Sequence, residues 1–143
     1  MRCYRIVRPP YASDLTGEGA KCHGGRWTPV GFPAIYTSEH PALAAWEVLV
    51  HLGNGTLDTA PLEHHLVAVE VPDDALTTRI PHVPHEPIAT GRDWLRSGDS
   101  LTLSVPSVVI PEARNLIINP LHPDMGEVSA EDLGVFVFDA RIS

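Results

Sequence analysis

One carboxylate in this sequence stands where the packing of a helix calls for a hydrocarbon. Glu47 is the only charged residue from Pro41 to Val50, and with Leu43, Trp46 and Val50 it follows the i, i+3, i+4, i+7 spacing of one buried helix stripe. A desolvated carboxylate is costly unless it is paired, hydrogen-bonded or protonated. We therefore expect Glu47 to meet a polar partner or to have a chemical role.

Polar groups upstream of Glu47 are candidates to meet it, or to share a ligand with it. Arg26 follows two glycines in a Gly-Gly-Arg-Trp segment; glycine lets the backbone approach a ligand closely, and a guanidinium offers a planar fork to a phosphate or carboxylate. The same segment also fits a tight turn with a surface arginine. Tyr36 fits either a core aromatic or a stacking surface for a ring-containing ligand. Thr37 and Ser38 add two hydroxyls.

Two polar residues in the second half of the chain stand beside prolines. Ser107 follows Pro106, and Asn119 precedes Pro120; such pairs are most often turn formers. No Gly-x-Ser-x-Gly elbow surrounds Ser107, so a nucleophilic serine is not indicated. We expect Ser107 to be a positioning hydroxyl, with Asn119 as a further candidate for the same shell.

The histidines and cysteines predict no metal site. Eight histidines are present, but none forms a His-x-x-x-His pair on a convincing helix or a Cys/His cluster of zinc spacing, which favours solvated loop histidines. Cys3 and Cys22 are expected to be reduced thiols. Neither a Walker loop nor a Gly-x-Gly-x-x-Gly segment after a strand occurs.

Length and composition predict one domain over residues 1–143. The 43% hydrophobic content is enough for a core, and no apolar run approaches 18 residues. Met1 is followed by a strand-like segment and not by a signal peptide, so we expect a soluble cytoplasmic protein with no membrane contact. The net charge of −8, without a basic cluster, argues against direct nucleic-acid binding.

Short elements must position these side chains, because 14 prolines and 11 glycines interrupt the chain. The predicted strands cover residues 2–7, 34–37, 65–71, 107–110, 115–119 and 134–142. A helix is predicted over 41–52, capped by Ser38 and stopped by Gly53-Asn54-Gly55. A second helix is predicted over 91–97, between Thr90 as cap and Gly98, and prolines predict a loop over 77–88. This mixture is α+β.

Two stretches of the chain resemble the RES domain family: GEGAKCHGGRWTPVGFPAIYTSEHPALAAWEVLVHL and VPSVVIPEARNLIINPLHP. The family is named for an Arg, a Glu and a Ser, which here fall on Arg26, Glu47 and Ser107. The resemblance runs from Tyr4-Arg5 to the segment 119–123 and so covers nearly the whole chain.

This resemblance implies an ADP-ribosyltransferase-like fold, with small mixed or antiparallel sheets and few short helices around an NAD cleft. It implies the toxin of a type II toxin–antitoxin pair, which depletes NAD by hydrolysis or phosphorolysis of the nicotinamide–ribose bond; some similar proteins instead transfer ADP-ribose to a protein target. NAD is then the substrate, with no cofactor and no metal. The implied partner is an Xre-type antitoxin, and a homodimer within the complex is left open.

The residues fit that class. Glu47 suits stabilisation of an oxocarbenium-like ribosyl cation. Arg26 suits the pyrophosphate and Tyr36 the nicotinamide ring. Ser107 would orient the ribose or the Glu47 carboxylate, and Asn119 would belong to the same shell. The alternative from another class is a non-catalytic binding module in which an Arg26–Glu47 pair staples the fold.

Overall fold

A single mixed sheet organises the chain. The structure is a computed structural model that describes residues 1–51, 63–139 and 141. Seven strands lie in the order β4-β5-β6-β2-β1-β3-β7, and all neighbours are antiparallel except the parallel pair β4 and β5. The strands are β1 (Arg2–Val7), β2 (Ile35–Ser38), β3 (His64–Glu70), β4 (Thr77–Arg79), β5 (Thr102–Pro106), β6 (Arg114–Ile118) and β7 (Ser129–Phe136). The expected α+β class is confirmed.

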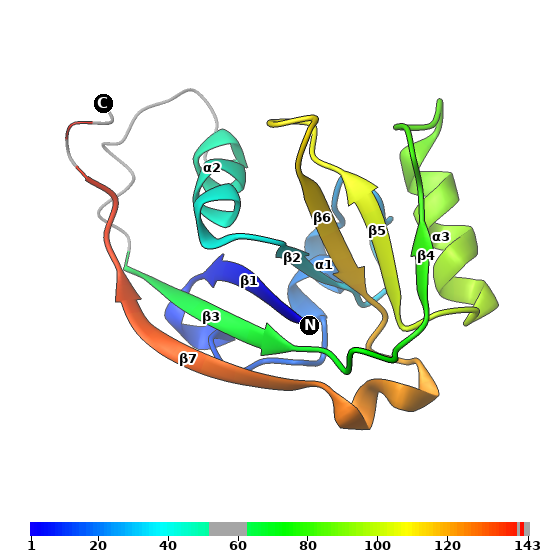
Figure 1. The fold of residues 1–143 in the computed structure, drawn as a ribbon, viewed down its shortest axis with the longest axis horizontal. Coiled ribbons are helices and arrows are strands. Elements are labelled where there is room, and N and C mark those ends of the chain that lie inside the picture. The colour runs from blue at the N-terminus through cyan, green and yellow to red at the C-terminus, as the bar shows by residue number, and fades with distance from the viewer. Residues whose placement is uncertain (52–62, 140, 142–143) are drawn as a thin grey trace.

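In the described part of the chain, three α-helices accompany the sheet: α1 (Glu18–His23), α2 (Pro41–His51) and α3 (Pro87–Ser97). Short 3₁₀ segments cover Pro9–Tyr11 and Pro123–Glu127. Helix α2 packs mainly against β1, and α3 connects the parallel strands β4 and β5 as a crossover (Figure 1). Among the described residues, no helix is long and apolar enough to cross a lipid bilayer.

Most predicted strands are confirmed within a residue or two, but the strand predicted over 107–110 is wrong. The strand instead occupies β5, which ends at Pro106. Beyond it, the hydroxyl of Ser107 accepts the backbone N–H groups of Val109 and Ile110 at 3.1 and 3.0 Å. These bonds offer the backbone a turn in place of a strand ladder. The β-branched residues at 108–110 favoured a strand in the sequence, but the hydrogen bonds to the Ser107 hydroxyl stabilise a turn there instead.

Several other helix and strand boundaries in the structure differ from the predicted ones. The last strand, β7, covers 129–136 and not 134–142; of the predicted residues, 140 and 142 lie outside the described ones. The predicted loop 77–88 contains β4, which pairs with β5. Helix α3 starts at Pro87, since proline suits the first helical position, and Gly98 ends it as predicted. Helix α1 was not predicted, because it is only six residues long, contains Gly19 and is flanked by Gly17 and Gly24.

Helix α2 has the predicted start but not the predicted cap or buried stripe. Ser38 is the last residue of β2, and its hydroxyl is bonded elsewhere, while His40 Nδ1 accepts the N–H of Ala42 at 3.0 Å. Leu43 is 3% exposed, but Trp46 is 49% exposed. The helix therefore buries a narrower stripe than its apolar composition suggests. Its predicted stop at 53–55 lies outside the described residues.

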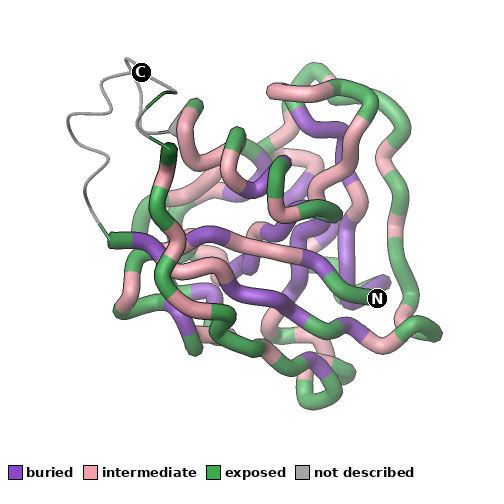
Figure 2. Tube along the Cα trace, turned by 60° about the vertical axis from the view of Figure 1, so that its left-hand side comes forward, coloured by how far each residue is buried: buried purple, intermediate pink, exposed green. Residues whose placement is uncertain are grey.

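Buried residues follow the central strands and form two apolar clusters (Figure 2). One joins strands β1, β3 and β6, and the other packs Trp27 and Trp94 against β5 and β6. The second cluster holds α3 against the Gly-Gly-Arg-Trp segment. Trp94 Nε1 donates to Ser100 Oγ at 2.9 Å, which satisfies the polar atom of this buried indole.

Close approach of α3 to this segment requires glycine at position 91. A Cβ atom at Gly91 would lie 1.7 Å from the backbone oxygen of Trp27. We expect Gly91→Ala to lower the free energy of unfolding by about 3 kcal/mol, the upper end of overpacking costs, because backbone must move. Thermal melts measure the effect. Gly126→Ala is the matched control, since a Cβ atom there meets nothing within 4 Å; equal melting of the two variants would contradict the steric argument.

Candidate active site

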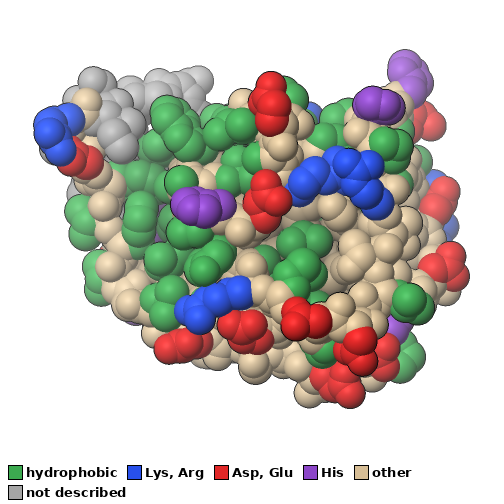
Figure 3. All heavy atoms as spheres, in the orientation of Figure 1, with side chains coloured by type: hydrophobic (Ala, Val, Ile, Leu, Met, Phe, Trp, Pro, Cys, Tyr) green, Lys and Arg blue, Asp and Glu red, His purple; other side chains and the backbone are tan. Residues whose placement is uncertain are grey.

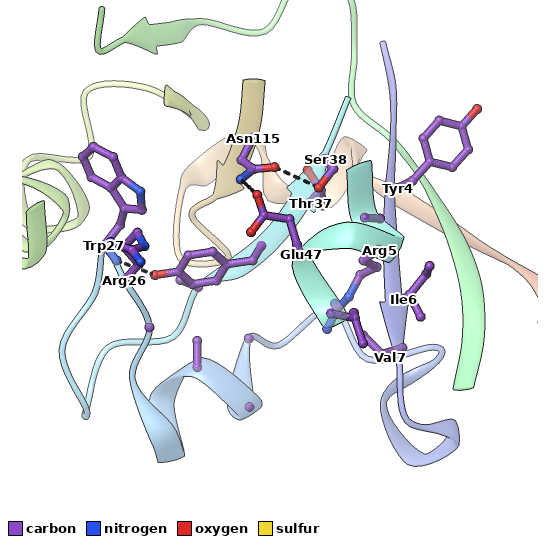
Figure 4. Close-up of a pocket in the computed structure, with 18 of the residues that line it drawn as sticks. Tyr4, Arg5, Ile6, Val7, Arg26, Trp27, Thr37, Ser38, Glu47 and Asn115 are labelled. Atoms are coloured by element: carbon purple, nitrogen blue, oxygen red, sulfur yellow. Dashed lines mark hydrogen bonds between the residues drawn. The ribbon is translucent and has the colours of Figure 1, made fainter. Parts of the chain in front are cut away.

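A cavity of about 500 Å³ opens between the first two strands, helix α2 and the segment that follows α1. Its size suits a small-molecule ligand. Polar side chains from separate elements converge on its wall: Arg5, Arg26, Tyr36, Ser38, Glu47 and Asn115 (Figure 4).

Glu47 reaches from α2 into this cavity, and two donors bind the same oxygen of its carboxylate. Ser107 Oγ donates to Oε1 at 2.7 Å, and Asn115 Nδ2 donates to Oε1 at 2.7 Å. Among the described residues, neither a hydrogen bond nor an ion pair joins Arg26 to Glu47. Glu47 therefore has the polar partners that its position required: Ser107, for which orienting this carboxylate was one of two predicted roles, and Asn115, which was not predicted. The Arg26–Glu47 staple is wrong.

Asn115 is itself held from its other side. Ser38 Oγ donates to Asn115 Oδ1 at 2.8 Å, and the two residues are direct cross-strand partners of β2 and β6. Figure 4 shows the resulting row of side chains from Ser38 through Asn115 to Glu47. The carboxylate, which only accepts hydrogen bonds, takes the amide nitrogen of Asn115, and the Ser38 hydroxyl donates to the amide oxygen on the other side.

Ser107 acts on Glu47 from behind the cavity wall. It is 1% exposed and is not among the residues that line the cavity. Its oxygen accepts two backbone N–H groups while its proton goes to Glu47. Of the two roles expected for Ser107, the geometry favours orienting the carboxylate over touching a ribose.

The Gly-Gly-Arg-Trp segment is shaped around Tyr36. A Cβ atom at Gly25 would lie 2.5 Å from the Tyr36 hydroxyl, so glycine permits the contact. That hydroxyl accepts the N–H of Trp27 at 3.1 Å and bonds Thr28 Oγ1 at 2.7 Å. Burial raises the pKa of Tyr36 above its usual value, which keeps the phenol neutral. The half-buried Tyr36 thus ties this segment to β2 and also lines the cavity.

Arg26 is an exposed side chain at the mouth of the cavity. It lines both the cavity and a neighbouring open groove that also contains Arg92. Among the described residues no hydrogen bond or ion pair engages its guanidinium, so this group is available to an anionic ligand.

Arg5 is a cavity residue that the sequence reasoning missed. Arg5 lines the cavity; its Nη1 donates to the backbone oxygen of Asp14 at 3.2 Å, and its buried Nε has no hydrogen-bond partner among the described residues. Burial lowers the pKa of Arg5 from its usual value. The available signal was a charged residue within a predicted strand, weaker than the one for Glu47 because Arg2 lies in the same strand.

Asn119 does not reach the cavity. It is 3% exposed; its Nδ2 donates to the backbone oxygen of Leu95 at 3.4 Å, and its Oδ1 accepts the N–H of Leu121 at 3.0 Å. Asn115 lies near the start of β6, whereas Asn119 follows its last residue, four positions or about 13 Å of extended chain further on. The segment Asn-Leu-Ile-Ile-Asn therefore begins with Asn115, which binds Glu47, and ends with Asn119, which does not.

The molecular surface bears out the acidic composition. On the face shown in Figure 3, acidic side chains gather along the lower edge, and Lys and Arg form small separate groups without a continuous basic surface among the described residues. This arrangement lacks the footprint of phosphate-backbone binding on that face. Also among the described residues, no group of three or more His, Cys, Asp or Glu could hold a metal ion.

The sequence is similar to a known domain family and to several known proteins. Residues 2–139 match the model of the RES domain. A "Prs ADP-ribosylating toxin" of Sphingobium sp. (strain YBL2) is 40% identical over 92% of this chain and 88% of that protein. A "Toxin Res" of Yersinia enterocolitica is 35% identical over 99% of each chain.

A solved structure shares the fold. It is the M. tuberculosis MbcT–MbcA toxin–antitoxin complex, with a TM-score of 0.72 over 92% of this chain and 83% of that chain. At 21% identity the likeness concerns the fold alone. The resemblance noted from the sequence motifs is therefore confirmed, over nearly the same residues.

Proposed function

The chain belongs to the RES domain family, and from this membership we propose that it is the toxin of a toxin–antitoxin pair that cleaves the nicotinamide–ribose bond of NAD. The observation that best supports this proposal is the position of Glu47, which lines a cavity of ligand size and whose carboxylate accepts hydrogen bonds from Ser107 and Asn115. The printed names of the relatives, an ADP-ribosylating toxin and Toxin Res, support the same reaction class.

The chemistry asks little of the protein beyond electrostatics and positioning. The bond from ribose C1′ to the nicotinamide nitrogen breaks, and its electron pair stays on nitrogen, so neutral nicotinamide leaves. The developing ribosyl cation is stabilised by a preorganised carboxylate, the role we assign to Glu47. An acceptor oxygen then bonds to C1′ and gives up its proton. Because the leaving group departs neutral, this route requires no metal.

Two arginines suit the anionic part of NAD. Arg26 at the mouth would hold the pyrophosphate through paired N–H donors, and the buried guanidinium of Arg5 would add a second positive charge in the wall. Tyr36 supplies an aromatic surface for the nicotinamide ring. The acceptor can be water, inorganic phosphate or a protein side chain, since all three use the same donor machinery.

The decisive experiment is incubation of the purified chain with NAD, with and without phosphate, followed by mass analysis of small molecules and protein. We expect release of nicotinamide. ADP-ribose indicates hydrolysis, its phosphorylated form indicates phosphorolysis, and a protein carrying ADP-ribose indicates transfer. Expression of the chain alone should arrest growth as cellular NAD falls. Unchanged NAD in the presence of folded, antitoxin-free protein would favour a non-catalytic binding module instead.

An unchecked enzyme of this kind would harm its own cell, so we also propose a neutralising antitoxin, of the helical Xre type, that covers the cavity. The proposed site of action is the cytoplasm, and a homodimeric toxin core within the complex is part of the proposal. Contact with DNA would come through the antitoxin, given the net charge of −8. Binding of operator DNA by this chain alone at physiological salt would contradict that arrangement.

A further inference from the structure

The two oxygens of the Glu47 carboxylate are treated differently by the fold. Both donors, Ser107 Oγ and Asn115 Nδ2, bind Oε1 at 2.7 Å, whereas Oε2 has no hydrogen-bond partner among the described residues. Glu47 itself lines the cavity. Oε1 therefore anchors the carboxylate, and Oε2 is left for a ligand.

We propose that Asn115 is a positioning residue for the reaction and that Ser38 acts through it by restraining its amide; this inference rests on the proposed function. A glutamate side chain has three rotatable bonds, and one anchor would still allow the carboxylate to turn about it. Asn115 from β6 and Ser107 from the turn after β5 approach from separate elements. Two hydrogen bonds to Oε1 from different directions restrict rotation of the carboxylate and so restrict the position of Oε2.

Ser38 holds the Asn115 amide on the side away from Glu47. An ionised carboxylate only accepts hydrogen bonds, so Glu47 itself selects the amide nitrogen and leaves Oδ1 turned away from it. The Ser38 hydroxyl donates to Oδ1 at 2.8 Å and so restrains the amide in that orientation, and the β2–β6 register holds the two residues directly opposite each other. Ser38 is 4% exposed, so solvent does not compete for the bond.

The hydrogen bonds from Ser38 to Asn115 and from Asn115 to Glu47 also stabilise the carboxylate at its half-buried position in the cavity wall. Donation to a carboxylate oxygen by a polarised amide is stronger than a bond between neutral groups. Ser38, Asn115 and Glu47 form a chain of hydrogen bonds in which each donor strengthens the next. Loss of either upstream member should disturb the carboxylate without emptying the NAD site.

The test combines two single variants with their double. Asn115→Leu removes the donor while keeping the number and branching of the side-chain heavy atoms, and we expect kcat to fall about 10- to 100-fold, the range for a misplaced catalytic group, while KM for NAD stays near the wild-type value. Ser38→Ala should lower kcat by a smaller factor, and Ser38→Thr, which keeps the hydroxyl, should restore it. The double variant should match Asn115→Leu alone, because Ser38 acts only through Asn115.

Controls separate this role from a merely structural one. Ser129→Ala, at an exposed position of β7, should leave kcat unchanged. Thermal melts and the NAD-induced rise in melting temperature show that each variant is folded and binds NAD. If Asn115→Leu proves unstable, Ser38→Ala and Ser38→Thr still carry the test, because they change a single small group.

Three results would overturn the inference: unchanged kcat in Asn115→Leu, a raised KM with unchanged kcat, or losses from the two single variants that multiply in the double. Equal losses in Ser38→Ala and Ser38→Thr would overturn the part assigned to the hydroxyl. Wild-type protein serves as reference in the same assay. Absence of NAD turnover there counts against the proposed function itself, whereas turnover by wild type and Asn115→Leu alike counts only against the positioning role.

Discussion

Glu47→Gln lowers NAD turnover by on the order of 100-fold or more, the cost of removing a preorganised electrostatic group. An amide keeps the shape and one oxygen, so it can still accept from Ser107 and Asn115, the two donors that bind Oε1. What disappears is the negative charge beside the developing ribosyl cation. The variant should therefore remain folded and bind NAD while losing kcat.

Release of nicotinamide, followed over time for wild type and Glu47→Gln, measures the effect. Glu112→Gln makes the same chemical change at an exposed position outside the cavity and should keep wild-type turnover. Melting curves with and without NAD exclude loss of folding or binding as the cause. Wild-type turnover in Glu47→Gln would remove Glu47 from the mechanism.

Arg26→Lys loses most NAD turnover, by roughly 10- to 100-fold, the worth of a hydrogen bond to a charged group. A guanidinium binds a pyrophosphate through two parallel bonds, whereas an ammonium keeps the charge as a single point with a different reach. Arg26 is exposed and has no bond to Glu47 among the described residues. Neither Arg26→Lys nor Arg26→Ala should then melt far below the wild type.

Arg92→Lys is the matched control, because Arg92 lines the neighbouring groove but not the cavity. Melting of each variant with and without NAD gives the second readout: a ligand clamp loses the NAD-induced stabilisation and keeps the fold. A collapse of the melting temperature in Arg26→Ala, together with near-normal turnover in Arg26→Lys, would show that Arg26 supports the fold and does not hold the ligand.

The position of Glu47 was predictable from sequence, although the reason proved only partly right. A lone charge within an apolar helix is a strong local signal, and the structure does give it polar partners. The buried stripe around it was wrong, since Trp46 and Val50 are 49% and 54% exposed. Helix α2 forms part of the cavity wall, so one of its faces packs on the core and another lies along the cavity. The spacing of apolar residues in the sequence does not distinguish these two faces.

Of the two partners of Glu47, Ser107 was among the predictions, but Asn115 was not predictable. Sequence reasoning also offered Arg26 by charge and Asn119 by its place beside a proline, and neither of them makes the contact. The pairing depends on the register of β2 against β6, which sets Ser38 opposite Asn115. These residues are far apart along the chain, and such a register is a property of the assembled sheet.

By itself the sequence determined what local chemistry dictates: the α+β class, most strands, the start of α2, and the candidates Arg26, Tyr36, Glu47 and Ser107, whose motifs also indicated the family. Only the tertiary structure decided which of these groups meet. It brought Arg5 and Asn115 into the cavity wall, kept Asn119 out of it, and left one carboxylate oxygen of Glu47 for a ligand. The physical reason is that spacing along the chain reports faces and turns, whereas contact between strands depends on sheet order and register, which many distant residues set together.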